Sequence, residues 1–351
     1  MRIAIAMVQV PFYTGGAEIH ANMLCDELKK RGHQAEVVTI PFKWYPASTL
    51  EDCMVEGMLM DLTKVNGERI DLVIAMKFPA IYCKANCKVL WLLHQHRQAY
   101  DLYGTKYSDM NESDELRRVR EEIIKADTKY ISEADAVFTN AQNTADRLLK
   151  YNGIEGKALY HPPLNYEKLE CKGYEDFIFY PSRIDAIKRQ RVLVEAARYT
   201  KSPVKMIIAG GGSQTEIEYL KNYIAEYKLE DKVVLAGFIS EEEKIDYYAR
   251  CLGVYFGAYN EDYGYITLEG FYSKKPVIVH EDAGGPLEFV ENGVNGFVIP
   301  EDAKEVAAKI DALYDDKEYA KKLGEAGFDS LIEKNINWDH VIDSLLEAAV
   351  K

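Results

Sequence analysis

Short runs of β-branched and apolar residues alternate with longer segments of helical periodicity along this chain. Such alternation is typical of stacked βαβ units, in which helices cover the faces of a parallel sheet. Strands are predicted at 2–8, 35–40, 71–75, 88–93, 136–139, 177–180, 204–209, 233–235, 253–255, 277–279 and 297–299. Helices are predicted at 17–31, 48–65, 112–132, 142–150, 187–199, 214–227, 241–249, 266–273, 286–291 and 303–313. The pattern therefore predicts an α/β fold that is built twice.

A pair of prolines separates the two series of elements. Pro162 and Pro163 remove two backbone donors and restrict φ, as is typical of a linker. The chain has 351 residues, enough for two α/β domains. We expect Rossmann-like domains at 1–165 and 166–336 that face an interdomain cleft, the default ligand site. A final helix with one apolar stripe is expected at 337–351.

Charge and cysteine content narrow the class of protein. The formal net charge is −14, whereas a protein that binds mainly nucleic acid needs a strongly basic surface. The six cysteines show neither a CxxC pair nor a zinc-site spacing, so we interpret them as reduced thiols. No apolar run is long enough to span a bilayer. We expect a cytoplasmic protein with, at most, peripheral contact at the inner membrane face, and the oligomeric state is left open.

The strongest motif is a pair of glutamates, Glu261 and Glu269, on either side of a predicted turn into a helix. Glu261 can accept hydrogen bonds from sugar hydroxyls, and Glu269 can accept those of a ribose diol. Backbone amides at the helix start can bind phosphate and sugar oxygens, namely those of Gly264, Tyr265, Ile266 and Thr267. The alternative interpretation is two surface glutamates beside an ordinary helix start.

Basic and glycine-rich segments follow other strands of the second half. Arg183 and Lys188 come after strand 177–180, where two fixed cations can neutralise a diphosphate leaving group without a metal. The alternative is a solvated basic turn. Gly210 and Gly211 follow strand 204–209 and allow a nucleotide to approach the backbone. Phe238 is a weaker candidate, included because it follows strand 233–235.

The first half offers fewer candidates. Gly15 and Gly16 form a turn between the first strand and its helix that is compatible with phosphate or sugar. His94 ends strand 88–93, where its ring can bind the transferred sugar or the acceptor hydroxyl; a structural histidine is the alternative. The sequence has no GxGxxG, Walker A or GxSxG motif, which weakens dehydrogenase, ATPase and hydrolase interpretations. It also lacks Asp-x-Asp, so we expect no metal and no other cofactor.

Taken together, these motifs resemble retaining glycosyltransferase family 4, whose members have the GT-B fold. The likeness covers nearly the whole chain and is densest from Phe179 to Pro300. It includes the segments Tyr180-Pro181-Ser182-Arg183, Ile207 to Gly212, Glu261 to Glu269, Lys275 to Ile278, Gly284 to Glu288 and Asn295-Gly296-Phe297. One departure concerns sugar recognition: Tyr263 and Tyr265 stand where Phe and a small aliphatic residue are commoner.

The resemblance implies a role for each candidate. Arg183 and Lys188 would hold the diphosphate, Glu269 the ribose, and Glu261 with the helix-start amides the sugar and phosphates. Gly16 would lie against the donor phosphates, and His94 would contact the sugar. The resemblance also implies metal-independent transfer with retention, and a terminal helix that crosses back to the first domain.

The expected partners are a UDP- or GDP-sugar carrying a hexose-type donor and a glycan, lipid-linked or small-molecule acceptor. Two alternatives remain. One is a sugar-nucleotide epimerase of the same fold. The other is a non-catalytic subunit that binds sugar nucleotides within a glycosyltransferase complex.

Overall fold

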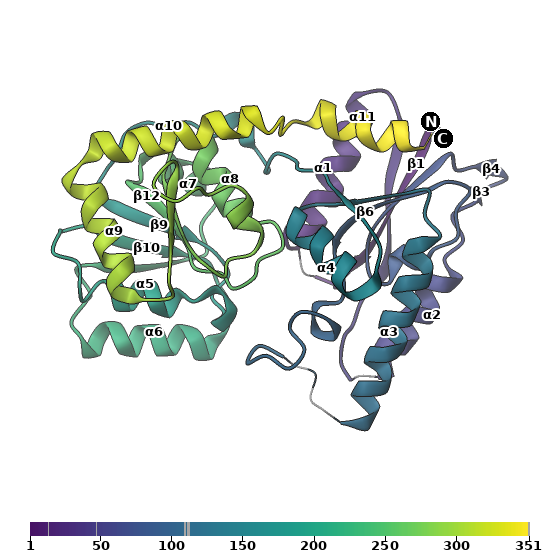
Figure 1. Cartoon of the computed structure of the whole chain (residues 1–351), viewed down its shortest axis with the longest axis horizontal. Helices are drawn as coiled ribbons and strands as arrows, with labels where there is room; N and C mark the ends of the chain where they lie inside the picture. Colours follow the sequence, from purple (N-terminus) through teal and green to yellow (C-terminus); the bar gives the residue numbers. More distant parts are fainter. Residues whose placement is uncertain (13, 47, 109, 111–112, 350–351) are drawn as a thin grey trace. The chain divides into compact units, whose positions relative to one another are not determined.

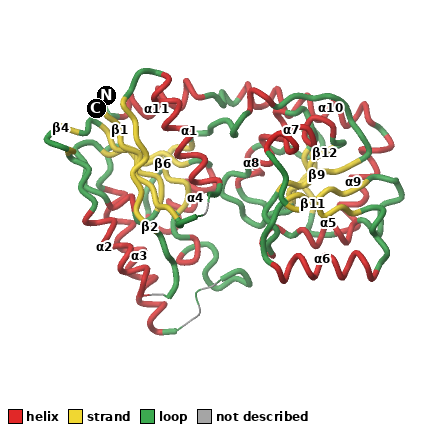
Figure 2. The backbone as a smooth tube through the Cα atoms, turned by 180° about the vertical axis from the view of Figure 1, so that it is seen from behind, coloured by secondary structure: helices red, strands yellow, loops and turns green. Residues whose placement is uncertain are grey.

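The computed structural model describes residues 1–12, 14–46, 48–108, 110 and 113–349 and divides into two compact units. Unit 1 comprises Met1–Leu164 and Asn337–Lys351, and unit 2 comprises Asn165–Ile336. Each unit contains one six-stranded sheet in which neighbouring strands pair in parallel (Figures 1 and 2). The prediction of an α/β fold with two parallel sheets is confirmed.

The unit 1 sheet has the order β2-β1-β5-β6-β7-β8. Its strands are β1 (Arg2–Gln9), β2 (Gln34–Pro41), β5 (Leu72–Lys77), β6 (Lys88–His94), β7 (Ala136–Thr139) and β8 (Lys157–Ala158). The helices of this unit are α1 (Gly16–Lys30), α2 (Ser48–Leu59), α3 (Asp114–Ser132), α4 (Gln142–Asn152) and α11 (Trp338–Ala348). Strands β1, β5 and β6 are almost wholly buried, so these central strands carry the core.

Two expectations for unit 1 need correction. The helix predicted at 48–65 ends at Leu59. A short antiparallel hairpin of β3 (Lys64–Val65) and β4 (Glu68–Arg69) follows, because Asn66 and Gly67 both adopt positive φ angles that suit a tight hairpin turn. Residue 112, the predicted start of the next helix, lies outside the described residues; α3 begins at Asp114, after Ser113 accepts the Leu116 amide at 3.3 Å.

The unit 2 sheet has the order β11-β10-β9-β12-β13-β14. Its strands are β9 (Phe177–Pro181), β10 (Lys205–Ala209), β11 (Val233–Gly237), β12 (Gly253–Phe256), β13 (Val277–His280) and β14 (Gly296–Ile299). The helices are α5 (Gln190–Ala196), α6 (Gln214–Glu226), α7 (Glu241–Arg250), α8 (Tyr265–Tyr272), α9 (Ala303–Asp315) and α10 (Lys317–Glu333). Helix α5 contacts α6 and α9, while α8 contacts α10, so helices cover both faces (Figure 1).

Two helices predicted in unit 2 are shorter than expected. The segment 187–199 is interrupted at Arg189, whose φ of 55° is left-handed, and splits into a 3₁₀ turn (Ala186–Lys188) and α5. The segment 286–291 contains only a 3₁₀ turn, Gly285–Glu288. Helix α10 was not predicted at all.

The terminal helix α11 packs within unit 1. Its residue Asp339 pairs with Arg31 just beyond α1, and the Trp338 ring lies 6.3 Å from that of Trp91, centroid to centroid. Trp338 and Trp91 are both buried. Residues 350 and 351, the last of the predicted helix, lie outside the described residues. Within the described ranges, no helix combines the length and the apolar character needed to cross a membrane.

Candidate active site

The order of strands in unit 2 marks one place where a ligand site is expected. The chain runs from β9 outward to β10 and β11, and then returns to the other side of β9 for β12, β13 and β14. Open α/β sheets bind ligands beyond the carboxyl ends of the strands at such a switch point. The loops after β9 and β12 therefore flank the expected site, and they carry Arg183, Lys188 and Glu261.

The structure brings two of these residues into contact. Lys188 Nζ forms an ion pair with Glu261 Oε2, and the two side chains are 17% and 25% exposed. The Lys188 ammonium also lies 5.7 Å from the centroid of the Phe256 ring. Because Tyr180 Oη donates to the Lys188 carbonyl at 2.5 Å, the backbone that carries this lysine is tied to β9. A cation and a carboxylate thus stand together at the switch point.

Arg183 has a different environment. Its side chain is 53% exposed, and it forms an ion pair with Asp185, with Nη2 and Oδ2 3.4 Å apart. Asp185 caps the following turn by accepting the Ile187 amide at 3.2 Å. Arg183 is therefore a surface cation in the same loop as Lys188, in a position to meet an incoming anion from solvent.

Arg189, which the sequence analysis overlooked, anchors this loop. Its buried guanidinium donates to both carboxylate oxygens of Asp282, at 2.7 and 2.8 Å, and pairs with Glu301 at 3.0 Å. Asp282 accepts, through its carbonyl, the amide of Asn260 at 2.8 Å. The arginine therefore links the Lys188 loop to the segment that leads into Glu261. The only feature of the sequence that could have indicated Arg189 is its position next to Lys188.

The glycine run after β10 supports the Arg183 loop. Gly210 has a φ of 140°, and a Cβ there would lie 2.2 Å from the Ser182 carbonyl oxygen. A Cβ at Gly212 would likewise lie 2.1 Å from the Ile184 carbonyl oxygen. Both glycines are thus required by backbone that packs on backbone. A Cβ at Gly211 would meet nothing within 4 Å, so among these three only Gly211 has the open space that a ligand needs.

Helix α8 starts beside Glu261. Gly264 is its N-cap, with a φ of 83°. The loop before it is held by the 283–285 segment, because Glu261 donates its amide to Ala283 and accepts that of Gly285, at 2.7 and 2.8 Å. Tyr265 and Ile266 are half-buried, whereas Thr267 is buried and its amide donates to the Gly264 carbonyl at 2.9 Å. An anion bound at the start of α8 would therefore have to share the Thr267 amide with the Gly264 carbonyl.

Glu269 lies in the middle of α8 and is buried. Its Oε1 accepts from Lys244 Nζ at 2.9 Å, and its Oε2 accepts from Tyr248 Oη at 2.7 Å. Burial alone would lower the pKa of Lys244, but the carboxylates of Glu269 and Glu241 raise it overall. Lys244 and Tyr248 were both missed, because only the packing of α7 beside α8 reveals them.

Phe238 directly follows β11, the edge strand of the unit 2 sheet. Its ring is almost fully exposed, at 91%. An exposed aromatic ring at the carboxyl edge of a sheet is available to stack on a planar ligand group.

In unit 1, the switch point lies between β1 and β5. Gly15 follows β1 as the N-cap of α1, with Gly16 as the first helical residue, and the Gly15 amide donates to Glu18 Oε2 at 2.8 Å. That amide is therefore already hydrogen-bonded within the first turn of α1. His94, the last residue of β6, is half-buried, and its Nδ1 contacts the Gln95 carbonyl, which makes Nε2 the acceptor in a neutral ring. Its register partner is Lys77 at the end of β5.

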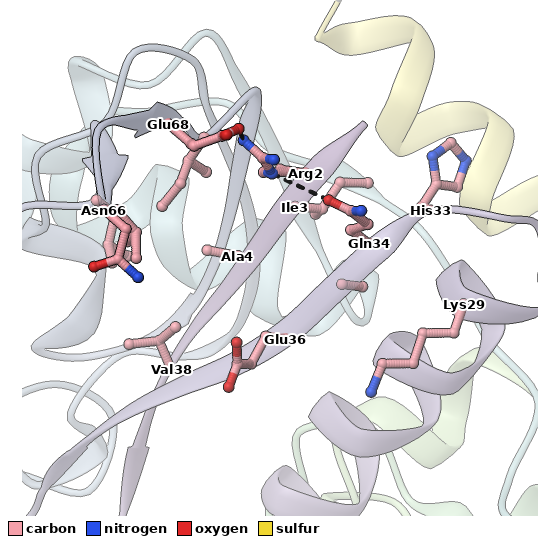
Figure 3. Close-up of a pocket in the computed structure, with 14 residues that line it drawn as sticks. Arg2, Ile3, Ala4, Lys29, His33, Gln34, Glu36, Val38, Asn66 and Glu68 are labelled. Atoms are coloured by element: carbon pink, nitrogen blue, oxygen red, sulfur yellow. Dashed lines mark hydrogen bonds and ion pairs between the residues drawn. The ribbon is translucent and has the colours of Figure 1, made fainter.

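A hollow of about 600 Å³ in unit 1, shown in Figure 3, has none of these residues in its lining. It is lined by the amino ends of β1 and β2, where Arg2 Nε donates to Gln34 Oε1 at 3.0 Å and Arg2 pairs with Glu68. Parallel sheets bind ligands at the opposite, carboxyl edge. We therefore do not assign the hollow to the active site.

Comparison with known proteins agrees with the fold and motifs. Residues 165–330 match the family model described as Glycosyl transferases group 1. An uncharacterized glycosyltransferase of Methanocaldococcus jannaschii is 21% identical over 97% of this chain and 96% of its own length. The α-1,3/1,6-mannosyltransferase of Homo sapiens is 26% identical over 57% of this chain and 55% of its own length.

Solved structures share the whole architecture. Sucrose-phosphate synthase from Thermosynechococcus elongatus superposes with a TM-score of 0.75 at 17% identity, covering 99% of both chains. The Anabaena HepE protein, solved with UDP and glucose, gives a TM-score of 0.71 at 17% identity over 100% of both chains. The fold and motifs thus define a glycosyltransferase with the GT-B fold. Residues 165–330, most of unit 2, match the glycosyl transferases group 1 family, and nearly the whole chain is similar to a glycosyltransferase.

Proposed function

We propose that this protein transfers a hexose-type sugar from a UDP- or GDP-sugar to a glycan, lipid-linked or small-molecule acceptor, with retention of anomeric configuration and without a metal. Unit 2 would bind the nucleotide-sugar and unit 1 the acceptor. The observation that carries the proposal is the Lys188–Glu261 pair at the unit 2 switch point. One relative is named a mannosyltransferase, and HepE is described in complex with UDP-glucose, which supports a hexose donor.

The chemistry follows from the residue types. Glycosyl transfer releases a nucleoside diphosphate, so negative charge develops on the leaving oxygen and must be stabilised. Lys188 and the exposed Arg183 supply two cations for this charge. When the diphosphate draws Lys188 toward itself, Glu261 would be released to accept hydrogen bonds from sugar hydroxyls. His94 Nε2, as an acceptor, would meet another hydroxyl of the sugar or the acceptor.

Metal-independent action is part of the proposal. The sequence contains no Asp-x-Asp. Among the described residues, no group of three His, Cys, Asp or Glu side chains is placed to hold a metal ion. Lys188 and Arg183 would therefore perform the charge neutralisation that a divalent cation performs in metal-dependent enzymes.

A thermal-shift screen of UDP-, GDP- and ADP-sugars tests donor binding, because a ligand that binds the native state raises the melting temperature. Glu269→Ala should weaken the binding of the selected donor. The variant should remain folded, but its melting temperature without ligand should fall, because Lys244 and Tyr248 lose a buried partner. Nucleotide release should depend on acceptor; release without any acceptor would favour the epimerase alternative. Full activity of a Lys188→Ala variant within a complex would favour the non-catalytic subunit. NMR of the product's anomeric proton would test retention.

A further inference from the structure

We infer that Lys244 and Tyr248 are positioning residues, which hold Glu269 so that the donor site selects a ribonucleotide over its 2′-deoxy counterpart. The inference rests on the proposed function, because it takes the ligand of unit 2 to be a nucleotide-sugar. It extends that function by assigning a hydroxyl requirement to two residues on α7, a helix that the donor motifs do not include.

The first argument is the occupancy of the Glu269 carboxylate. Lys244 Nζ takes one position on Oε1 at 2.9 Å, and Tyr248 Oη takes one on Oε2 at 2.7 Å. A carboxylate has about four acceptor positions, two on each oxygen. One position on each oxygen therefore remains to accept a hydrogen bond, and this pair matches the two adjacent hydroxyl donors of a ribose. A single hydroxyl, as in 2′-deoxyribose, would satisfy only one.

The second argument is that this carboxylate is rigidly fixed. The Glu269 side chain is only 8% exposed, the Lys244 side chain is 21% exposed, and Tyr248 is fully buried. Lys244 is itself held by Glu241, one turn before it on α7, at 3.1 Å. Lys244 and Tyr248 stand four residues apart on α7, so they project from the same face toward Glu269. A carboxylate that is hydrogen-bonded through both oxygens cannot rotate to accommodate a different ligand.

The third argument concerns the charge of the Glu269 side chain. Glu269 lies beside the Lys244 cation, and an ionised carboxylate can accept hydrogen bonds but cannot donate them. Such a group repels phosphate and attracts hydroxyls. A site of this kind rejects an analogue that lacks the expected hydroxyl, because a buried acceptor is then left without its partner.

The experiment compares nucleotide pairs on the full-length protein. Isothermal titration gives the Kd values of UDP and 2′-deoxy-UDP, and of GDP and 2′-deoxy-GDP. Wild type should prefer the ribonucleotide of its base by about tenfold or more, the factor expected for one hydrogen bond to a charged group. Lys244→Met and Tyr248→Phe should each reduce that preference severalfold. Lys244→Arg should restore much of it, and Lys221→Met, on the exposed part of α6, should leave it unchanged.

Each outcome has one meaning. A preference that stays at the wild-type value in both variants, while both nucleotides weaken equally, would show a merely structural ion pair and overturn this inference alone. Equal affinity of wild type for both sugars would also overturn it. Binding of no nucleotide and no nucleotide-sugar to wild type would instead reject the proposed function. If Lys244→Met does not fold, Tyr248→Phe, which removes a single hydroxyl, still decides the question.

Discussion

Lys188 and Glu261 form an ion pair across the unit 2 switch point, although 73 residues separate them in the sequence. The two loops that carry them follow β9 and β12, which are hydrogen-bonded neighbours in the sheet. A cation paired with a carboxylate in this way is fixed before a ligand arrives. Because both side chains retain some exposure, a diphosphate can replace the carboxylate as the lysine's partner.

Lys188→Ala is expected to reduce kcat by about a hundredfold to a thousandfold, the effect of removing one preorganised electrostatic group at developing charge. The free energy of unfolding should also fall, by about 1–3 kcal/mol, because the variant removes the Lys188 cation from a largely buried carboxylate. Steady-state kinetics with saturating donor measure the effect. Lys221→Ala, an exposed lysine on α6, is the control. A Lys188→Ala enzyme with wild-type kcat would remove this lysine from the mechanism.

The glycines after β10, Gly210 to Gly212, can act by packing on neighbouring backbone or by leaving room for a ligand. The sequence alone does not distinguish these two roles. Gly210→Ala should destabilise unit 2 by about 1–3 kcal/mol, because it combines a positive φ with a Cβ against the Ser182 carbonyl. Gly211→Ala has open space and should leave the urea midpoint unchanged. If a nucleotide approaches the backbone here, Gly211→Ala should still weaken donor binding in titration. Unchanged donor affinity would show that this run is purely structural.

The hydrophobic pattern predicted the strands well, because a strand buried between two helical layers appears in the sequence as a short continuous apolar run. Strand β12 (Gly253–Phe256) is an example. The pattern missed α10, which contains two glycines that disfavour a helix. The structure explains them. A Cβ at Gly324 would lie 1.9 Å from the Lys274 carbonyl oxygen, and one at Gly327 would lie 2.3 Å from the Phe271 ring. Close packing against the Phe271–Lys274 segment thus overrides local propensity.

The candidate site shows the same limit. The sequence pointed to Arg183, Lys188 and Glu261 because each follows a strand, and in a parallel sheet the carboxyl ends of the strands lie at one edge. It did not point to the partners of Glu269, because Lys244 and Tyr248 lie in the middle of an ordinary amphipathic helix. No local pattern states that α7 will pack with that face toward α8.

Chelation should leave activity intact. After dialysis against EDTA, initial rates should match those of untreated enzyme, because in the proposed function Arg183 and Lys188 supply the positive charge at the leaving group. Added magnesium or manganese should not increase them. The measurement is nucleotide release in the presence of acceptor. Loss of activity in chelator, restored by either metal, would show that the two cations do not suffice.

The last prediction concerns acid stability of unit 1. His20 on α1 stacks on His161, with ring centroids 3.7 Å apart, and burial lowers the pKa of His20 to about 3. Below pH ~6.5 the unfolded chain therefore binds a proton at His20 that the native state does not bind. This one group should lower the free energy of unfolding by about 1.4 kcal/mol per pH unit below that value.

His20→Phe should make this slope shallower by about that amount while preserving the ring stack. It should cost little at neutral pH, because within the described structure His20 Nε2 has no hydrogen-bond partner. Urea unfolding followed by tryptophan fluorescence is specific for this unit, since the chain's 3 tryptophans, Trp44, Trp91 and Trp338, all belong to unit 1. The partly exposed His340 gives a control variant, His340→Phe. Identical pH profiles for wild type and His20→Phe would mean that the buried ring does not govern acid unfolding.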